Sequence, residues 1–273
     1  MLPLRDNVPS ESTPFVNYLM IGICTVVFLF QVVEEKSNKA QMVEKYGMIP
    51  QRVRHPGQPI ELKEAVLVRT SSGTIEKRVE TRQAAAPPFA PWLTLLTCIF
   101  LHGGWMHFLG NMWFLYIFGD NVEDRFGHIG YFIMYLAWGM AASFAHLLTN
   151  ANSTIPTIGA SGAIAGVMGA YMWLHPHGRV LTLVPLGILS RVMEIPAVLF
   201  LGIWFVIQLF SGTTSIGGVE ASGVAWWAHI GGFAVGFVTA VVMQFIRGKG
   251  PRMGPNSYRP PDRTYYEPPS QQY

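Results

Sequence analysis

Charged residues make up only 13% of this 273-residue sequence, whereas half of the residues are apolar and the mean hydropathy is positive. Soluble domains usually carry about 25% charged residues. The composition therefore argues against a soluble domain and predicts a polytopic membrane protein. The pI of about 8.9 comes from basic residues in loops and termini. We interpret it as a sign of membrane topology and expect no nucleic-acid partner.

Cysteine is nearly absent as well, because Cys24 and Cys98 are the only two. Both lie in or beside apolar runs, so we expect two buried thiols, although the count allows one disulfide. The sequence has no CxxC, P-loop, dinucleotide fingerprint or internal repeat. These absences give no support to cofactor-dependent classes, and we expect no cofactor. Residues 1–14 lack a cleavable signal pattern, so the first apolar run is expected to remain as an anchor.

Six apolar runs predict an all-α bundle of six transmembrane helices within residues 15–246, followed by a disordered cytoplasmic tail at 247–273. The runs are 15–33, 104–119, 129–149, 160–174, 196–211 and 224–246. A crossing needs about 20 residues. The second, fourth and fifth runs are shorter, which indicates a thinned bilayer or a water-filled cavity within the bundle. The polar segment 150–156 leads into Gly159 and is expected to line that cavity.

The basic residues predict the orientation of the bundle. If the short N-terminal segment 1–14 is cytoplasmic, nine Lys and Arg residues fall on the inner side and none in the short outer loops. The inner residues are Arg5, Arg125, Arg179, Arg191, Arg247, Lys249, Arg252, Arg259 and Arg263. Both termini are therefore expected in the cytoplasm. Residues 34–91 would form a long polar outer loop, either with a hairpin around 71–73 or as a solvated loop on the membrane.

Two apolar helices each carry a polar side chain that is costly to place in lipid and therefore suggests a function. Ser161 stands in the small-residue sequence from Gly159 to Gly169, and His229 stands in a similar stretch from Ala228 to Gly236. A hydroxyl nucleophile and an imidazole base are the minimum for acyl transfer. Every Asp and Glu lies in an expected loop, tail or helix end, so we expect a Ser–His dyad without a carboxylate. Helix packing and polar bonding between helices are the competing interpretations of these two residues.

The second run adds His107 and Asn111, which share one helix face at a spacing of four residues. Both side chains can donate hydrogen bonds, and the Ser161 amide at a helix start adds a third donor. These are the groups that an oxyanion requires. His102, near the outer start of this run, is expected to be structural. A zinc site formed with His102 is the alternative, but no metalloprotease Glu accompanies the histidines, and we expect no metal.

Four features together resemble the rhomboid family of intramembrane serine proteases, over most of residues 93–246. They are HGGWMH with Asn111, then GDNVEDRFG, GASG around Ser161, and AHIGG around His229. The resemblance implies Ser161 as nucleophile, His229 as general base, and His107 and Asn111 as oxyanion ligands. It also implies structural roles for Glu123 and Arg125. The sequence lacks the Trp-Arg pair of many members, and Ala165 stands where some have an aromatic residue over the base.

The resemblance implies an endopeptidase that cleaves transmembrane protein substrates near the outer end of a helix in the lipid bilayer. Entry is expected past the fifth helix and the loop 212–223, with Gly212, Gly217 and Gly218 as hinges. A bacterial plasma membrane is the expected location. The alternative is a non-catalytic rhomboid-like protein that binds or escorts membrane proteins, although such relatives generally lack the Ser or His. A transporter would be expected to show mid-span charge or a repeat. The sequence specifies no oligomeric state.

Overall fold

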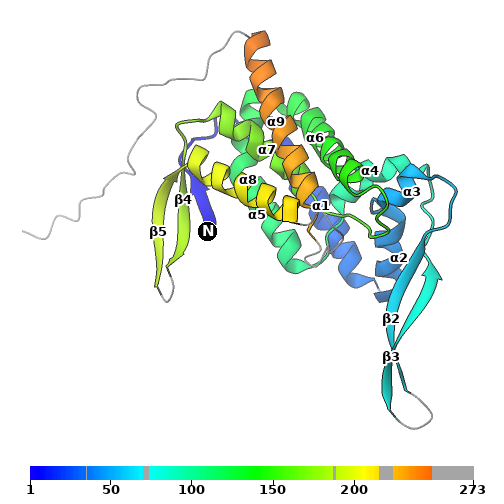
Figure 1. The fold of residues 1–273 in the computed structure, drawn as a ribbon. Helices are drawn as coiled ribbons and strands as arrows, with labels where there is room; N and C mark the ends of the chain where they lie inside the picture. The colour runs from blue at the N-terminus through cyan, green and yellow to red at the C-terminus, as the bar shows by residue number, and fades with distance from the viewer. Residues whose placement is uncertain (35, 70–73, 187–188, 215–223, 248–273) are drawn as a thin grey trace, which may run out of the picture.

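The computed structural model describes residues 1–34, 36–69, 74–186, 189–214 and 224–247. Helices occupy all six apolar runs (Figure 1). They are α1 (Phe15–Val33), α5 (Trp105–Phe126), α6 (His128–Thr149), α7 (Ser161–Leu174), α8 (Ala197–Thr214) and α9 (Trp226–Arg247). Four of them, α1, α6, α8 and α9, are long and apolar enough to cross a membrane. The chain is thus a mostly helical polytopic membrane protein.

The two remaining apolar helices depart from a simple span. Before α5 lie a 3-10 turn (Pro91–Leu93), α4 (Thr94–Thr97) and another 3-10 turn (Cys98–Phe100), and this unit meets α5 at an angle of 80°. Counting that bent pair as one span gives five. Helix α7 has only 14 residues, as its short apolar run predicted. By contrast, α5 continues past its expected end at 119, because the polar residues 120–125 extend the helix after the apolar run has stopped.

The expected all-α chain is confirmed only as far as mostly helical, because the described residues also form two small sheets. The strand β1 (Leu2–Asp6) pairs antiparallel with β4 (Arg179–Leu186), which pairs with β5 (Leu189–Pro196). The strands β2 (Glu61–Arg69) and β3 (Ile75–Gln83) form the hairpin that was one of two interpretations of the 34–91 segment. Its expected turn at 71–73 lies outside the described residues. The two hairpins project from opposite ends of the helical body (Figure 1).

Helix α7 lies at the centre of the body, in contact with α5, α6, α8 and α9, and most of its residues are buried. Its contact with α9 depends on glycine. A Cβ atom at Gly232 or Gly236 would overlap the carbonyl oxygen of Gly162 or Gly166, respectively. Such close approach of two backbones is the packing expected of small-residue helix faces. The small residues around Ser161 and His229 therefore serve packing and also bring these two helices together.

The segment between α1 and α4 contains two further helices, α2 (Lys36–Tyr46) and α3 (Pro50–Arg54). Buried Glu44 holds the base of the β2–β3 hairpin, because its carboxylate accepts hydrogen bonds from the Arg82 guanidinium and from the Ala85 amide at 2.7 Å. The Arg52 guanidinium donates to the Glu44 carbonyl at 2.6 Å and to the Ala85 carbonyl at 3.0 Å. The Thr97 hydroxyl of α4 donates to the Tyr46 carbonyl at 2.6 Å, so the described part of the 34–91 segment is also bonded to the helical body.

Candidate active site

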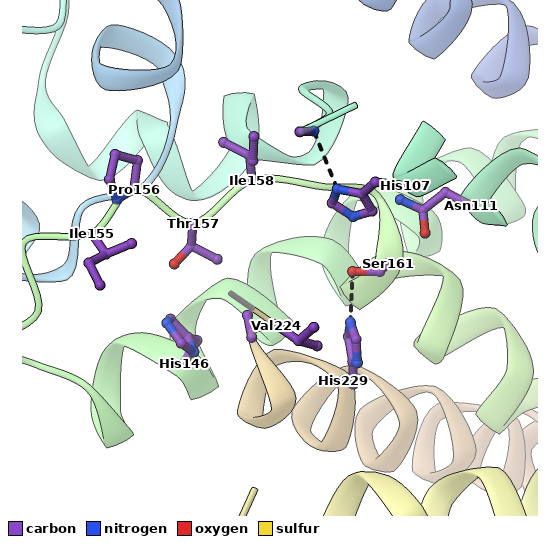
Figure 2. Close-up of a pocket in the computed structure, with 12 residues that line it drawn as sticks. His107, Asn111, His146, Ile155, Pro156, Thr157, Ile158, Ser161, Val224 and His229 are labelled. Carbon is purple, nitrogen blue, oxygen red and sulfur yellow. Dashed lines mark hydrogen bonds between the residues drawn. The ribbon is translucent and has the colours of Figure 1, made fainter. Parts of the chain in front are cut away.

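The N-terminus of α7 places Ser161 directly beside His229 of α9. The Ser161 Oγ lies 2.8 Å from His229 Nε2, which is the hydrogen bond expected between a nucleophile and its base (Figure 2). His229 lies in the first turn of α9, and the close approach of α7 and α9 fixes the separation of the two side chains. A Ser hydroxyl that donates to a neutral imidazole nitrogen can pass its proton to that nitrogen as it attacks a carbonyl.

The turn before Ser161 requires glycine. Gly159 has φ of +129°, a conformation that side-chain-bearing residues rarely adopt. A Cβ at this position would also come within 2.7 Å of the His107 Cε1 and Nε2 atoms. The Gly159 amide donates to the Cys98 carbonyl at 2.9 Å, which ties the turn to the bent unit before α5. Gly159 therefore lets the His107 ring reach the space beside Ser161.

The helix α5 brings His107 and Asn111 to the same place, on the side of Ser161 away from His229 (Figure 2). His107 Nδ1 accepts the Gly103 amide hydrogen at 3.3 Å, so in the neutral ring the proton lies on Nε2. Asn111 is 8% exposed, and its Nδ2 has no hydrogen-bond partner among the described residues. A buried amide without a partner is uncommon and calls for an explanation. Two side-chain donors thus lie close to the hydroxyl, and one of them lacks an acceptor.

These four side chains face one cavity of about 580 Å³. One wall is the chain segment 155–158, as expected for the end of the polar approach to Gly159. Thr157 fixes that wall by pairing with Met48, through backbone hydrogen bonds of 2.8 and 3.0 Å. His146, Val224 and Ala225 complete another side. The cavity is large enough for several side chains of a polypeptide next to Ser161.

The contacts of His229 were not predicted in full. Its Nδ1 lies 2.8 Å from the Oε1 of Gln208 on α8. Its ring packs against Trp204, with centroids 5.8 Å apart, and edge-on against Trp226 at 6.2 Å. Two indoles thus lie against the imidazole, although Ala165 supplies no aromatic ring of its own. The sequence carried a signal for Gln208, since an amide in the apolar run 196–211 is as unusual as an imidazole in 224–246.

Other expected features have mixed outcomes. His102 is fully buried, and its main chain is held by Gln31, whose side chain donates to the His102 carbonyl and accepts from its amide. Among the described residues no group of three His, Cys, Asp or Glu side chains could hold a metal ion. Cys24 and Cys98 are both free and buried. Of the expected hinge glycines, Gly217 and Gly218 lie outside the described residues, as does the tail 248–273.

Residues 90–244 match the family model described as Rhomboid domain. The match covers more than half of the chain and includes Ser161, His229, His107 and Asn111. The chain belongs to the rhomboid family. Its central geometry, a serine on a short helix beside a histidine on a long one, lies entirely within the matched span.

The curated relatives share this domain at moderate identity. The chain is 32% identical over 157 residues to "Rhomboid-like protein 11, chloroplastic" of Arabidopsis thaliana. The aligned region covers 55% of this chain and 52% of that protein. It is 32% identical over 152 residues to "Rhomboid protease GluP" of Bacillus subtilis (strain 168), covering 56% and 26%. It is 33% identical over 115 residues to "RHOMBOID-like protein 5" of Arabidopsis thaliana, covering 42% and 36%. The chain thus spans about half or less of the length of these relatives.

Proposed function

We propose that this rhomboid protein is an intramembrane serine endopeptidase that cleaves membrane-anchored proteins near the outer end of a transmembrane helix. The observation that carries the proposal is the 2.8 Å contact between Ser161 Oγ and His229 Nε2 at a cavity that also exposes the donors of His107 and Asn111. A nucleophile, a base and oxyanion donors are the set that acyl transfer needs. The name of the Bacillus relative, a rhomboid protease, supports the same function.

In the proposed reaction, His229 Nε2 takes the Ser161 proton while Oγ attacks the scissile carbonyl carbon. The carbonyl oxygen becomes an oxyanion that accepts hydrogen bonds from Asn111 Nδ2, His107 Nε2 and the Ser161 amide, which has no intrahelical acceptor in the first turn of α7. The imidazolium then gives its proton to the leaving amine, and the peptide bond breaks to leave an acyl-enzyme. Water activated by His229 hydrolyses that ester and restores the Ser161 hydroxyl.

The membrane arrangement is part of the proposal. All six apolar helices would lie in the bilayer, with α7 as a short central helix and the start of α7 near the outer surface. The nine inner basic residues against none in the short outer loops support cytoplasmic termini. A bacterial plasma membrane is the proposed location. Substrates would enter laterally past α8, which has mostly exposed or half-buried side chains.

A fluorophosphonate probe tests the nucleophile directly in detergent-solubilised protein. The wild type should be labelled, and Ser161→Ala should lose labelling completely. The unfolding temperature of Ser161→Ala should equal that of the wild type. Ser143→Ala is the matched control, because Ser143 is also a buried serine on an apolar helix but lies against the Cys98 sulfur, at 3.3 Å. That variant should label like the wild type.

Cleavage of a transmembrane reporter in liposomes tests the activity. The wild type should cut the reporter, and neither Ser161→Ala nor His229→Ala should do so. A folded wild-type protein that neither reacts with the probe nor cuts reporters of varied sequence would overturn the proposal in favour of a binding protein. Cleavage retained by folded His229→Ala would show that this imidazole is not the base.

A further inference from the structure

The imidazole of His229 is held from both sides. Its Nε2 meets Ser161 Oγ at 2.8 Å and its Nδ1 meets Gln208 Oε1 at 2.8 Å. A carboxamide oxygen only accepts hydrogen bonds, so in this arrangement Nδ1 carries the proton and donates it to Gln208. The neutral ring then has a lone pair on Nε2, where the Ser161 hydroxyl lies. This is the tautomer that a general base acting on Ser161 requires.

Gln208 is unusual for its place in the chain. It is only 5% exposed, whereas its neighbours Ile207 and Leu209 on α8 are exposed. The other polar side chains of α8, at 211, 213 and 214, are half-buried or exposed. An amide pointing inward from an apolar helix needs a compensating partner. In this structure that partner is the imidazole of His229.

The packing of α8 on α9 fixes the direction of the Gln208 side chain. One turn before it, Trp204 lies with its ring centroid 5.8 Å from that of His229 and 6.0 Å from that of Phe233. Phe205 stacks on the same Phe233 at 4.6 Å. One turn after Gln208, a Cβ at Gly212 would come within 3.0 Å of the Ile230 side chain. The Gln208 amide therefore lies between two packing contacts of α8 with α9, at Trp204 and at Gly212.

We propose that Gln208 is a positioning residue for His229: its carboxamide oxygen holds the imidazole in the Nδ1–H tautomer and aims Nε2 at Ser161. The inference rests on the proposed peptidase function and deepens it, since it replaces a free Ser–His pair with a Ser–His–Gln chain. The third member comes from α8, the helix at which substrate entry is proposed. Efficient catalysis then requires α8 to be packed against α9 at the level of Gln208.

The test compares Gln208→Met, which keeps the size but removes the acceptor, with Gln208→Glu, which keeps an acceptor oxygen. Removing the hydrogen-bond partner that orients a metal-ligating histidine typically costs about 10- to 100-fold in function, and we expect a loss of that order for a histidine that acts as a base. Gln208→Met should therefore lower kcat by about that factor with KM unchanged, and it should slow fluorophosphonate labelling of Ser161 equally. Gln208→Glu should retain most of the wild-type kcat. Ile133→Met, a change at an exposed residue of α6 that does not line the cavity, should leave both constants unchanged.

Three outcomes would overturn the proposal while leaving the peptidase function intact. The first is wild-type kcat and labelling rate in folded Gln208→Met. The second is an equal loss in the Met and Glu variants, which would indicate a packing role. The third is a folded Gln208→Glu variant that has lost activity, and this outcome decides the matter if Gln208→Met does not fold. A wild type that neither labels nor cleaves would instead overturn the proposed function itself.

Discussion

The two ends of the helical body both bury polar side chains, but they use them differently. At the end of α7 where Ser161 lies, polar groups face a cavity, and the Asn111 amide nitrogen has no partner among the described residues. At the other end of α7, Tyr171 donates to the Asp6 carboxyl at 2.5 Å, and the Asn121 side chain donates to the same oxygen at 2.9 Å. One end leaves a buried donor facing a cavity, as the proposed function requires, whereas the other end joins its polar groups to one another.

Glu123 is the clearest structural case at that second end. Its fully buried carboxylate accepts the amide hydrogens of Val16 and Asn17 at 3.0 and 2.7 Å, in the first turn of α1. It also lies 2.5 Å from His128 Nδ1 at the start of α6. A carboxylate at a helix N-terminus binds amides that have no intrahelical acceptor. Glu123 thus joins α1, α5 and α6, in agreement with the structural role that the family resemblance implied.

This comparison predicts that, among the following variants, substitution of Asn111 lowers kcat the most. Asn111→Ala should lower kcat by about 10²- to 10³-fold, because it removes one proposed oxyanion donor. Its free energy of unfolding should change by less than about 1 kcal/mol, because no hydrogen bond of the amide nitrogen is lost. Reporter cleavage and unfolding in detergent measure the two quantities. Leu109→Ala, a change on the exposed face of the same helix, should alter neither kcat nor folding.

Glu123→Ala should show the opposite pattern. It leaves two amides at the start of α1 and the His128 ring without their acceptor, so the free energy of unfolding should fall by about 3 kcal/mol. The protein that remains folded should label with a fluorophosphonate at the wild-type rate, since Ser161 lies at the other end of α7. Glu123→Gln keeps one acceptor oxygen and should lose less stability. Slow labelling of folded Glu123→Ala would mean that the two ends are coupled.

The sequence predicted which polar side chains meet at the cavity better than it predicted what surrounds them. Ser161, His229, His107 and Asn111 are polar residues in apolar runs, where the cost of burial makes each of them conspicuous. The structure places all four at one cavity. Gln208 carried the same kind of signal, but an isolated amide is also common as a contact between helices. Its role depends on which residue of α9 faces it, and that is a property of tertiary packing.

Strand pairing was the least predictable part of the fold. Leu2 pairs with Leu183 and Asp6 with Val180, so residues about 180 positions apart form one sheet. Residues 1–14 are too short and irregular to show strand periodicity by themselves. The end of α5 was missed for another reason, because hydropathy reports burial in lipid and not helical hydrogen bonding. Asp120 to Arg125 continue the helix although they end the apolar run.

The next effect is the pH dependence of stability, which we expect from Asp6 at the end of the helical body away from the cavity. Burial raises the pKa of the Asp6 carboxyl from its ordinary value near 3.8 to about 7. The native state thus holds this proton more tightly than the unfolded chain. The contribution of Asp6 to stability is complete below about pH 4 and is lost as the pH rises through 7, with a slope approaching about 1.4 kcal/mol per pH unit.

Asp6→Asn should remove that slope between pH 4 and 7. The free energy of unfolding of this variant should stay, as far as position 6 determines it, at the value of the wild type with Asp6 protonated. Unfolding in detergent across this range, with wild type and variant in parallel, isolates the Asp6 contribution from that of other carboxyls. The asparagine keeps an oxygen to accept from Tyr171, so the network should persist. Parallel pH profiles of the two proteins would show that Asp6 is ionised in the folded state.

The smallest effect is expected at a polar contact that belongs to neither end network. Arg54 donates to the Asn152 side chain at 3.1 Å, and both groups are exposed. Exposed polar pairs contribute at most about 1 kcal/mol and often less. Arg54→Ala should therefore change the free energy of unfolding by less than about 0.5 kcal/mol and leave KM unchanged. The wall is held by backbone bonds, with Met48 pairing Thr157 and the Gln51 amide donating to the Ser153 carbonyl at 3.0 Å. A raised KM in Arg54→Ala would show instead that side chains of the 34–91 segment set the shape of the substrate cavity.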